Sequence, residues 1–113
     1  MVNPYSYKEN LYNILIKEKR YQDPDFSAAK LAEILGISPF KLSRILKREF
    51  GMSYTDMVHA YRIQDAKRYL KDKRLESVTV DDIGAMVGFH NRQSFFEAFR
   101  NTTGTTPDKY RNA

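Results

Sequence analysis

Basic and amide side chains are concentrated in two short stretches of this sequence, residues 38–50 and 91–103. The first stretch holds four basic residues against one acidic residue, a local charge of +3, and the second holds two against one, a local charge of +1. A guanidinium or amide group can form two hydrogen bonds with one base edge, whereas Lys and Arg also pair with phosphates. These stretches therefore have the chemistry needed to bind a nucleic-acid duplex.

The first stretch predicts a helix over residues 39–50. Its core face is predicted to consist of Leu42, Ile45, Leu46 and Phe50. On the opposite face, Arg44 is the strongest candidate for base contact, because its planar fork can bond O6 and N7 of guanine together. Phe40 is either a contact for a thymine methyl group or a semi-exposed core residue. The predicted base contacts are Phe40, Ser43 and Arg44, and the predicted phosphate contacts are Ser38, Lys41, Lys47 and Arg48.

The second stretch predicts a helix over about 92–102, with Phe95, Ala98 and Phe99 facing inward. Glu97 is less suited to a duplex: its carboxylate can accept from cytosine N4, but it would repel phosphates. We therefore expect this helix to contribute less affinity than the first. Its predicted base contacts are Arg92, Gln93, Phe96 and Glu97, and its predicted phosphate contacts are His90, Asn91 and Arg100. Phe96 is expected to be exposed.

The elements that position these side chains form a repeat, residues 31–57 and 83–110. The two copies are offset by 52 residues up to the first glycine and by 53 residues after it. In each copy a short apolar helix ends at a glycine, a tight turn follows, and a capping residue opens a more polar helix. This order is typical of a helix-turn-helix, whose second helix fits a DNA major groove. The matched anchors are Leu31 with Ile83, Gly36 with Gly88, Leu42 with Phe95, Leu46 with Phe99, Gly51 with Gly104, and Met57 with Tyr110.

Helix-start signals predict an all-α fold of about seven helices: two helix-turn-helix subdomains at 1–53 and 73–113, joined by a linker helix within 54–72. A linker of 18 residues would span about 27 Å, comparable to the ~34 Å between major-groove entries on one side of B-DNA. Ser6 and Glu9 predict a capping box for a first helix that continues to a turn at 22–25 and covers the core with Leu11, Ile14 and Leu15. Further caps are predicted at Ser27, Ser38, Ser53, Thr79 and Thr106, and Ile34 is expected on a buried face.

Two further features are open to alternatives. The basic run 67–74 is either a solvated helix end or a phosphate contact. Gly84 is expected to allow close packing against a bulky aromatic side chain, since a glycine inside a helix costs about 1 kcal/mol of helix preference.

Composition excludes several classes of protein. The 113 residues include no cysteine, which rules out disulfides and thiolate metal sites, and no apolar run approaches a membrane span. The net charge of +5 is consistent with a polyanionic partner. No phosphate-binding glycine loop or separate acid pair is found, and His59 is expected to be a packing or surface residue, so an enzyme is not expected. We expect a cytoplasmic protein with no cofactor and no membrane contact.

An ordered set of residues carries a resemblance to a known family. In the first unit it includes Leu31, Ala32, Ser38, Leu42, Ser43 and Arg44, and in the linker Arg62, Ile63, Ala66 and Leu70. In the second unit it includes Val87-Gly88-Phe89, Ser94-Phe95, Phe99-Arg100, Thr103-Gly104, Thr106-Pro107 and Tyr110-Arg111. From 26 to 111 the chain resembles the DNA-binding domain of the AraC/XylS family of bacterial transcription regulators. The resemblance implies two helix-turn-helix units that bind adjacent major grooves of a promoter or operator in double-stranded DNA.

In that family the domain is often the C-terminal part of a longer regulator, so we expect an excised domain rather than a freestanding short regulator, monomeric in isolation. The rival function is a helical protein-protein interaction module that docks RNA polymerase or a sensor domain. A cluster of tyrosines near the first helix would then form its docking face, although such residues are more often core and rim. The cluster consists of Tyr5, Tyr7, Tyr12 and Tyr21.

Overall fold

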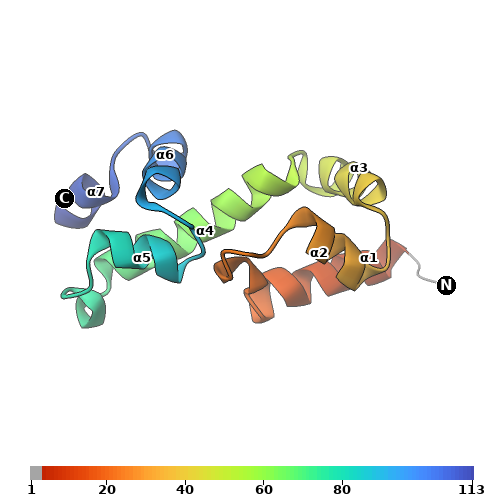
Figure 1. Ribbon diagram of the computed structural model, residues 1–113, viewed down its shortest axis with the longest axis horizontal. Coiled ribbons are helices and arrows are strands. Elements are labelled where there is room, and N and C mark those ends of the chain that lie inside the picture. The colour runs from red at the N-terminus through yellow and green to blue at the C-terminus, as the bar shows by residue number, and fades with distance from the viewer. Residues whose placement is uncertain (1–3) are drawn as a thin grey trace.

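The computed structural model describes residues 4–113, and this part of the chain is helical with no strand (Figure 1). It is elongated, with principal extents of 49 × 24 × 20 Å. The predicted all-α fold, with two helix-turn-helix units and a long helix between them, is confirmed. The elements are α1 Pro4–Tyr12, a π-helical turn Asn13–Lys17, a 3-10 turn Arg20–Gln22, α2 Ala28–Leu35, α3 Pro39–Phe50, α4 Tyr54–Lys71, a 3-10 turn Lys73–Leu75, α5 Val80–Met86, α6 Arg92–Thr103 and α7 Pro107–Asn112.

Short polar side chains start the helices from α2 onward, and each of these caps except Asn91 was predicted. Each cap accepts a hydrogen bond from the backbone N–H three residues later, which satisfies a donor that the first turn leaves free. The caps are Ser27, Ser38, Ser53, Thr79, Asn91 and Thr106.

The prediction for the first helix is wrong at both ends. α1 begins at Pro4, so Ser6 lies inside the helix and is not its cap. A proline is well tolerated in the first helical turn, because its missing N–H would have no partner there. The helical segment ends at Lys17, and Lys19 adopts a left-handed conformation with φ of 49°, well before the turn at 22–25. The predicted cover is nevertheless present, since Leu11, Ile14 and Leu15 are buried.

Two hydrophobic cores divide the molecule, and α4 contributes to both. Met57 and Val58, near the start of α4, belong to the first core, which includes α1, α2 and α3. Ile63, Ala66 and Leu70, further along α4, belong to the second core with α5 and α6. Because one continuous helix is packed into both cores, it acts as a rigid connection between them.

Two residues predicted to be buried are instead partly exposed. Ile34 is 44% exposed. The buried face of α2 extends around the helix axis from the direction of Leu31 to that of Ala32, and Ile34 points outside this face. Phe50 is 36% exposed, because it is the last residue of α3 and forms one wall of a shallow apolar groove beside Tyr61.

Two glycines of the second unit are required by close packing. An added Cβ at Gly84 would lie 2.8 Å from Cγ of Phe95, which confirms the predicted contact with an aromatic side chain. Gly88 has φ of 115°, and an added Cβ would lie 2.6 Å from Nε of Arg62 and collide with the carbonyl oxygen of Tyr21. The turn of the second unit therefore packs directly against the segment of the first unit that leads into α2.

Candidate nucleic-acid interface

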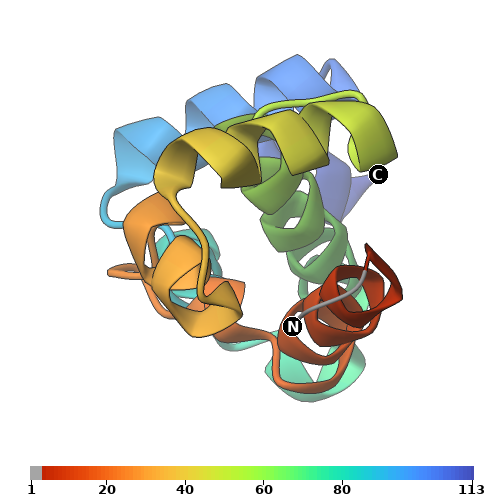
Figure 2. The same cartoon turned by 90° about the vertical axis from the view of Figure 1, so that its right-hand side faces the viewer.

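The second helices of the two units, α3 and α6, lie on the same face of the molecule. Both are seen end-on along the upper edge in Figure 1 and lengthwise along the upper edge in Figure 2, so their axes run in similar directions. They are displaced from each other along the long axis of the molecule, with α4 connecting their units (Figure 1). This is the arrangement that the repeat predicted.

α3 presents the outward face that its helical phase predicted. Leu42, Ile45 and Leu46 are buried, whereas Phe40 is 74% exposed. The guanidinium carbon of Arg44 lies 5.9 Å from the centroid of the Phe40 ring, so the two outward side chains are neighbours. Phe40 is therefore a surface residue and not a member of the core. Ser43, Arg44, Lys47 and Arg48 are all exposed.

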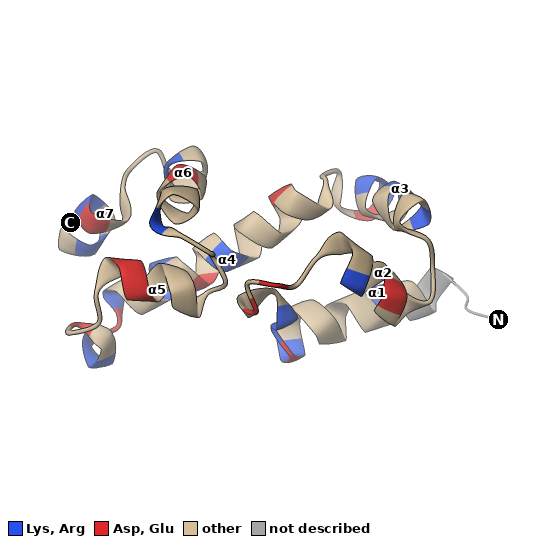
Figure 3. Cartoon of the chain, in the orientation of Figure 1, with Lys and Arg blue, Asp and Glu red and all other residues tan. Residues whose placement is uncertain are grey.

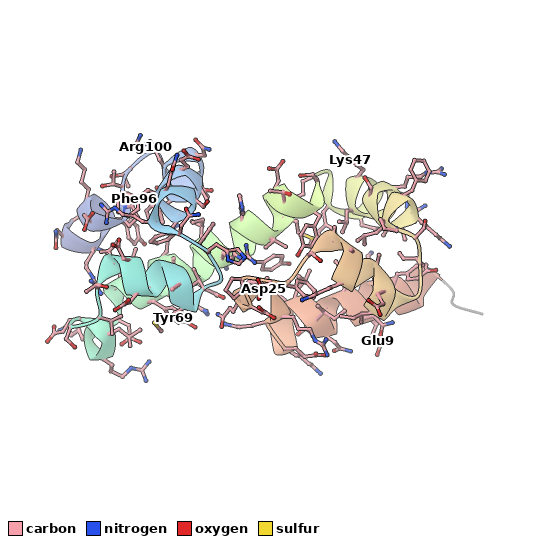
Figure 4. The ribbon with its side chains drawn as sticks, in the orientation of Figure 1. Glu9, Asp25, Lys47, Tyr69, Phe96 and Arg100 are labelled. Atoms are coloured by element: carbon pink, nitrogen blue, oxygen red, sulfur yellow. The ribbon has the colours of Figure 1, made fainter. Side chains whose placement is uncertain are left out.

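The remaining predicted contacts of α3 differ in what they touch. Ser38 caps the helix through its hydroxyl oxygen, which leaves the hydroxyl hydrogen free to donate to a phosphate. Lys41 extends towards α1, with its ammonium 5.4 Å from the ring centroid of Tyr7. Lys47 projects outward in Figure 4, and basic residues mark the same helix in Figure 3. Arg48 lies 3.4 Å from the neighbouring carboxylate of Glu49.

On α6, Arg92 is held inside its own unit. Its Nη1 lies 2.5 Å from a carboxylate oxygen of Asp81 on α5, and its guanidinium carbon lies 4.0 Å from the centroid of the Phe96 ring. Asp81 is a functional candidate that the sequence analysis missed, since its place in the first turn of α5 already explained an acidic residue there. Phe96 was expected to be exposed, but it is half-buried, edge-on to Phe95 and packed against the second core.

Three other outward residues of the second unit are also engaged, whereas Arg100 is exposed. Gln93 donates to Glu97 one turn later at 3.2 Å. Asn91 caps α6 with its side-chain oxygen, and Nε2 of His90 lies 3.4 Å from a carboxylate oxygen of Asp25 in the first unit. Arg100 is exposed near the upper edge of α6 in Figure 4.

Comparison with known proteins identifies the family. Residues 31–113 match the family described as a helix-turn-helix domain. The arabinose operon regulatory protein of Escherichia coli strain K12 is 32% identical over 89 residues, which cover 79% of this chain and 30% of that protein. The chain belongs to the AraC/XylS family. It therefore spans less than a third of the length of this curated relative.

Solved structures share this fold. The C-terminal domain of the two-component response regulator yesN from Fusobacterium nucleatum is 31% identical, with a TM-score of 0.82 over 92% of this chain and 96% of that one. The DNA-binding domain of AdpA, solved in complex with a target DNA, has a TM-score of 0.81 at 21% identity, over 94% of this chain and 89% of that one. This chain is thus a helix-turn-helix transcription-regulator domain of the AraC type.

In this AraC-type domain most of the basic run 67–74 makes internal contacts. The ammonium groups of Lys67 and Lys71 lie 5.8 and 5.0 Å from the ring centroid of Tyr110. Lys71 also donates to the carbonyl of Ala113 at 2.9 Å. Arg74 forms a paired contact with Asp72, and the pKa of that carboxyl is lowered by its hydrogen bonds with Arg74. The run therefore has a structural use without any phosphate.

The sequence analysis also missed a buried polar cluster on α4. Asp65 is 4% exposed and accepts from the Tyr21 hydroxyl and from the Gln22 amide at 2.9 Å. Burial, followed by the hydrogen bond to Asp65, raises the pKa of Tyr21. Lys19 and Arg68 also reach Asp65, at 3.5 and 2.5 Å. The spacing of 44 residues between Tyr21 and Asp65 gave no local signal for this contact.

The three tyrosines near α1 whose side chains the structure describes do not form one docking face. Tyr21 is 2% exposed and its hydroxyl is bound inside the fold, Tyr7 is half-buried, and Tyr12 is 54% exposed. The side chain of Tyr5 lies outside the described residues.

No helix within 4–113 is both long and apolar enough to cross a membrane.

Proposed function

We propose that this domain binds double-stranded DNA at a promoter or operator in a sequence-specific way and regulates transcription as part of a longer regulator. The placement of α3 and α6 on one face (Figure 2), together with the exposed polar side chains that both helices carry, is the observation that carries this proposal. The names of the relatives support it, and so does the likeness in fold to AdpA, a protein solved with its target DNA.

The proposed complex has α3 and α6 in adjacent major grooves on one side of a duplex. A major groove admits an α-helix. The 18 residues of α4 span about 27 Å, which suits major-groove entries ~34 Å apart once the widths of the two units are added. One compact unit would cover a single groove, whereas this elongated molecule can cover two.

We assign the sequence-predicted contacts to two roles. Base edges are bound by Phe40, Ser43 and Arg44 on α3 and by Arg92, Gln93, Phe96 and Glu97 on α6. Phosphates are bound by Ser38, Lys41, Lys47, Arg48, His90, Asn91 and Arg100. In this proposal Arg92 either binds its base alongside Asp81 or exchanges that carboxylate for the base.

Selection of bound duplexes from a random pool, followed by fluorescence anisotropy over a range of salt concentrations, tests this function. We expect a site with two conserved elements about one helical turn apart. If about five to eight phosphates are neutralised, the slope of log affinity against log salt is expected to be about −5 to −7. Failure to enrich any sequence, or affinity that does not depend on salt, would contradict the proposal.

Binding, without catalysis or a cofactor, is the activity that we propose. RNA polymerase is the protein partner to be tested, by adding it to a preformed complex of domain and duplex. We expect the isolated domain to be monomeric in sedimentation experiments and the parent regulator to act in the cytoplasm.

A further inference from the structure

The two helix-turn-helix units touch each other at a second place besides α4. Arg62, near the middle of α4, is 8% exposed and lies at this contact. Resting on the proposed function, we propose that Arg62 is a positioning residue that fixes the orientation of α6 relative to α3 and so sets the spacing between the two halves of the DNA site.

On the side of the first unit, Arg62 binds backbone carbonyls. Its Nε donates to the carbonyl of Tyr21 at 2.7 Å, and its Nη2 donates to the carbonyl of Asp23 at 3.3 Å. These carbonyls belong to the segment that leads into α2, the first helix of the first unit. Arg62 therefore fixes the point at which that unit begins.

On the side of the second unit, Arg62 meets the turn between α5 and α6. Its guanidinium carbon lies 5.6 Å from the ring centroid of Phe89, and Gly88 is so close that a Cβ would collide with Nε of Arg62. His90, the next residue of the turn, lies beside Asp25 of the first unit. The turn that aims α6 therefore rests on the same arginine that holds the entry to α2. Figure 4 places Asp25 between the two units.

Asp65 holds the other side of the same segment. It accepts hydrogen bonds from the Tyr21 hydroxyl and the Gln22 amide. Thus Arg62 binds the backbone of Tyr21 while Asp65, one turn further along α4, binds its side chain. The carbonyl groups that Arg62 binds are in this way held in place from both sides of the segment.

The choice of arginine favours a role in geometry over a role in stability. A buried cation loses its hydration, and apolar residues of similar volume often stabilise a fold as well or better. A guanidinium group, however, directs several donors in a fixed plane, so it defines the relative positions of the groups that it binds. A second attachment beside α4 adds to the rigidity that its packing into both cores already gives, because it restrains any remaining twist between the units.

Fixed orientation matters for a DNA site with two halves. Once α3 is bound, the effective concentration of α6 at its own groove depends on how narrowly its position is defined. Loss of the Arg62 contacts is therefore expected to weaken binding at the preferred spacing and to reduce discrimination against other spacings.

The first experiment needs no DNA. The chain has no cysteine, so Lys47→Cys and Arg100→Cys together allow one spin label on α3 and one on α6. Pulsed electron resonance then gives the distribution of distances between the labels. We expect a narrow distribution in this parent and a broad one after Arg62→Gln. Gln64→Ala, at an exposed position of the same helix, is the matched control and is expected to leave the distribution narrow.

The second experiment uses the selected duplex and derivatives with one or two base pairs inserted between its halves. We expect the unlabelled parent to prefer the original spacing and Arg62→Gln to reduce that preference by about ten-fold. Arg62→Lys, which keeps the charge but not the planar fork, is expected to fall between the two. Circular dichroism checks that each variant stays folded.

A narrow distance distribution in folded Arg62→Gln would overturn the proposal, and so would an equal loss of affinity at every spacing. If Arg62→Gln does not fold, the distances between the labels are measured in Gly88→Ala instead. The new Cβ of that variant displaces the turn between α5 and α6 while Arg62 remains. A parent that binds no DNA would refute the proposed function, yet the distances between the labels would still decide the role of Arg62.

Discussion

The helices α3 and α6 hold equivalent places in the repeat, but their outward side chains are engaged differently. On α3, Arg44 borders the exposed ring of Phe40, and no carboxylate within the described part of the chain pairs with it. On α6, Arg92 is bound by Asp81 and stacked on Phe96, and Gln93 is bound by Glu97. A free cation gains more from a phosphate or base than one that must first leave a carboxylate. Equivalent folds therefore present two unequal surfaces, and α3 is expected to supply most of the affinity.

Alanine substitutions on the two helices give the largest expected difference. Arg44→Ala is expected to weaken binding to the selected duplex by roughly 1 to 3 kcal/mol, because it removes a bidentate base contact. Gln93→Ala is expected to cost less, because Gln93 must exchange its bond with Glu97 for the base. Gel shifts at one fixed salt concentration measure both. Equal losses would contradict the unequal contribution of the two helices.

The same inequality appears in the packing beneath the helices. Ala32 of the first unit corresponds to Gly84 of the second, and Leu42 corresponds to Phe95. The second unit thus has a larger side chain on one helix and a smaller one on the other. Gly84→Ala is expected to lower the free energy of unfolding by about 1 to 2 kcal/mol, since overpacking outweighs the gain in helix preference.

A double variant tests that explanation. Phe95→Leu should make room for the new methyl group, so Gly84→Ala is expected to cost much less in the Phe95→Leu background. Urea denaturation of the four proteins measures the coupling between the two positions. A rise in melting temperature for Gly84→Ala alone would refute the close packing.

A smaller effect is expected at Asp81. Asp81→Asn releases Arg92 and removes a negative charge from the DNA-facing side, so binding to duplexes of random sequence should rise by about 0.5 kcal/mol at low salt. The ratio of specific to random affinity should fall, because Arg92 is no longer oriented. Asp82→Asn is the matched control: it also lies in the first turn of α5, but Arg92 pairs with Asp81. If Asp81→Asn and Asp82→Asn change the ratio of specific to random affinity equally, the ion pair between Asp81 and Arg92 has no part in recognition.

The repeat and the bounds of the helices from α2 onward were predictable because local rules decide them, whereas the bounds of α1 were not. Caps, glycines and apolar spacing gave the bounds of α3 to the residue and placed α4 within 54–72. Contacts between side chains far apart in the chain left no such pattern: Asp81 with Arg92, Asp65 with Tyr21, and Arg62 with the carbonyl of Tyr21. Phe50 and Ile34 were wrongly predicted to be buried, because helical phase alone does not tell where a neighbouring element ends. Which side chains touch DNA stays a prediction.

The last and smallest effect concerns pH at the contact between the units. His59 is half-buried on α4, with its ring centroid 5.4 Å from that of Phe89 in the second unit. Burial, and then the positive charge of Arg62, lower the pKa of His59 below its ordinary value of 6.5, although Asp56 partly opposes the shift. The unfolded chain therefore binds a proton more readily than the folded one, and the free energy of unfolding should fall as pH drops below 6.5.

Urea denaturation at pH 7.5 and 5.5 is expected to show a larger loss of stability for the wild type than for His59→Gln, which has no proton to gain. Gln64→Ala, at an exposed position of the same helix, is the matched control and is expected to follow the wild type. Because His59 faces the second unit, that unit should lose its fluorescence or NMR signature of packing first. Parallel losses in the wild type and His59→Gln would show that the contact between the units does not respond to pH through His59.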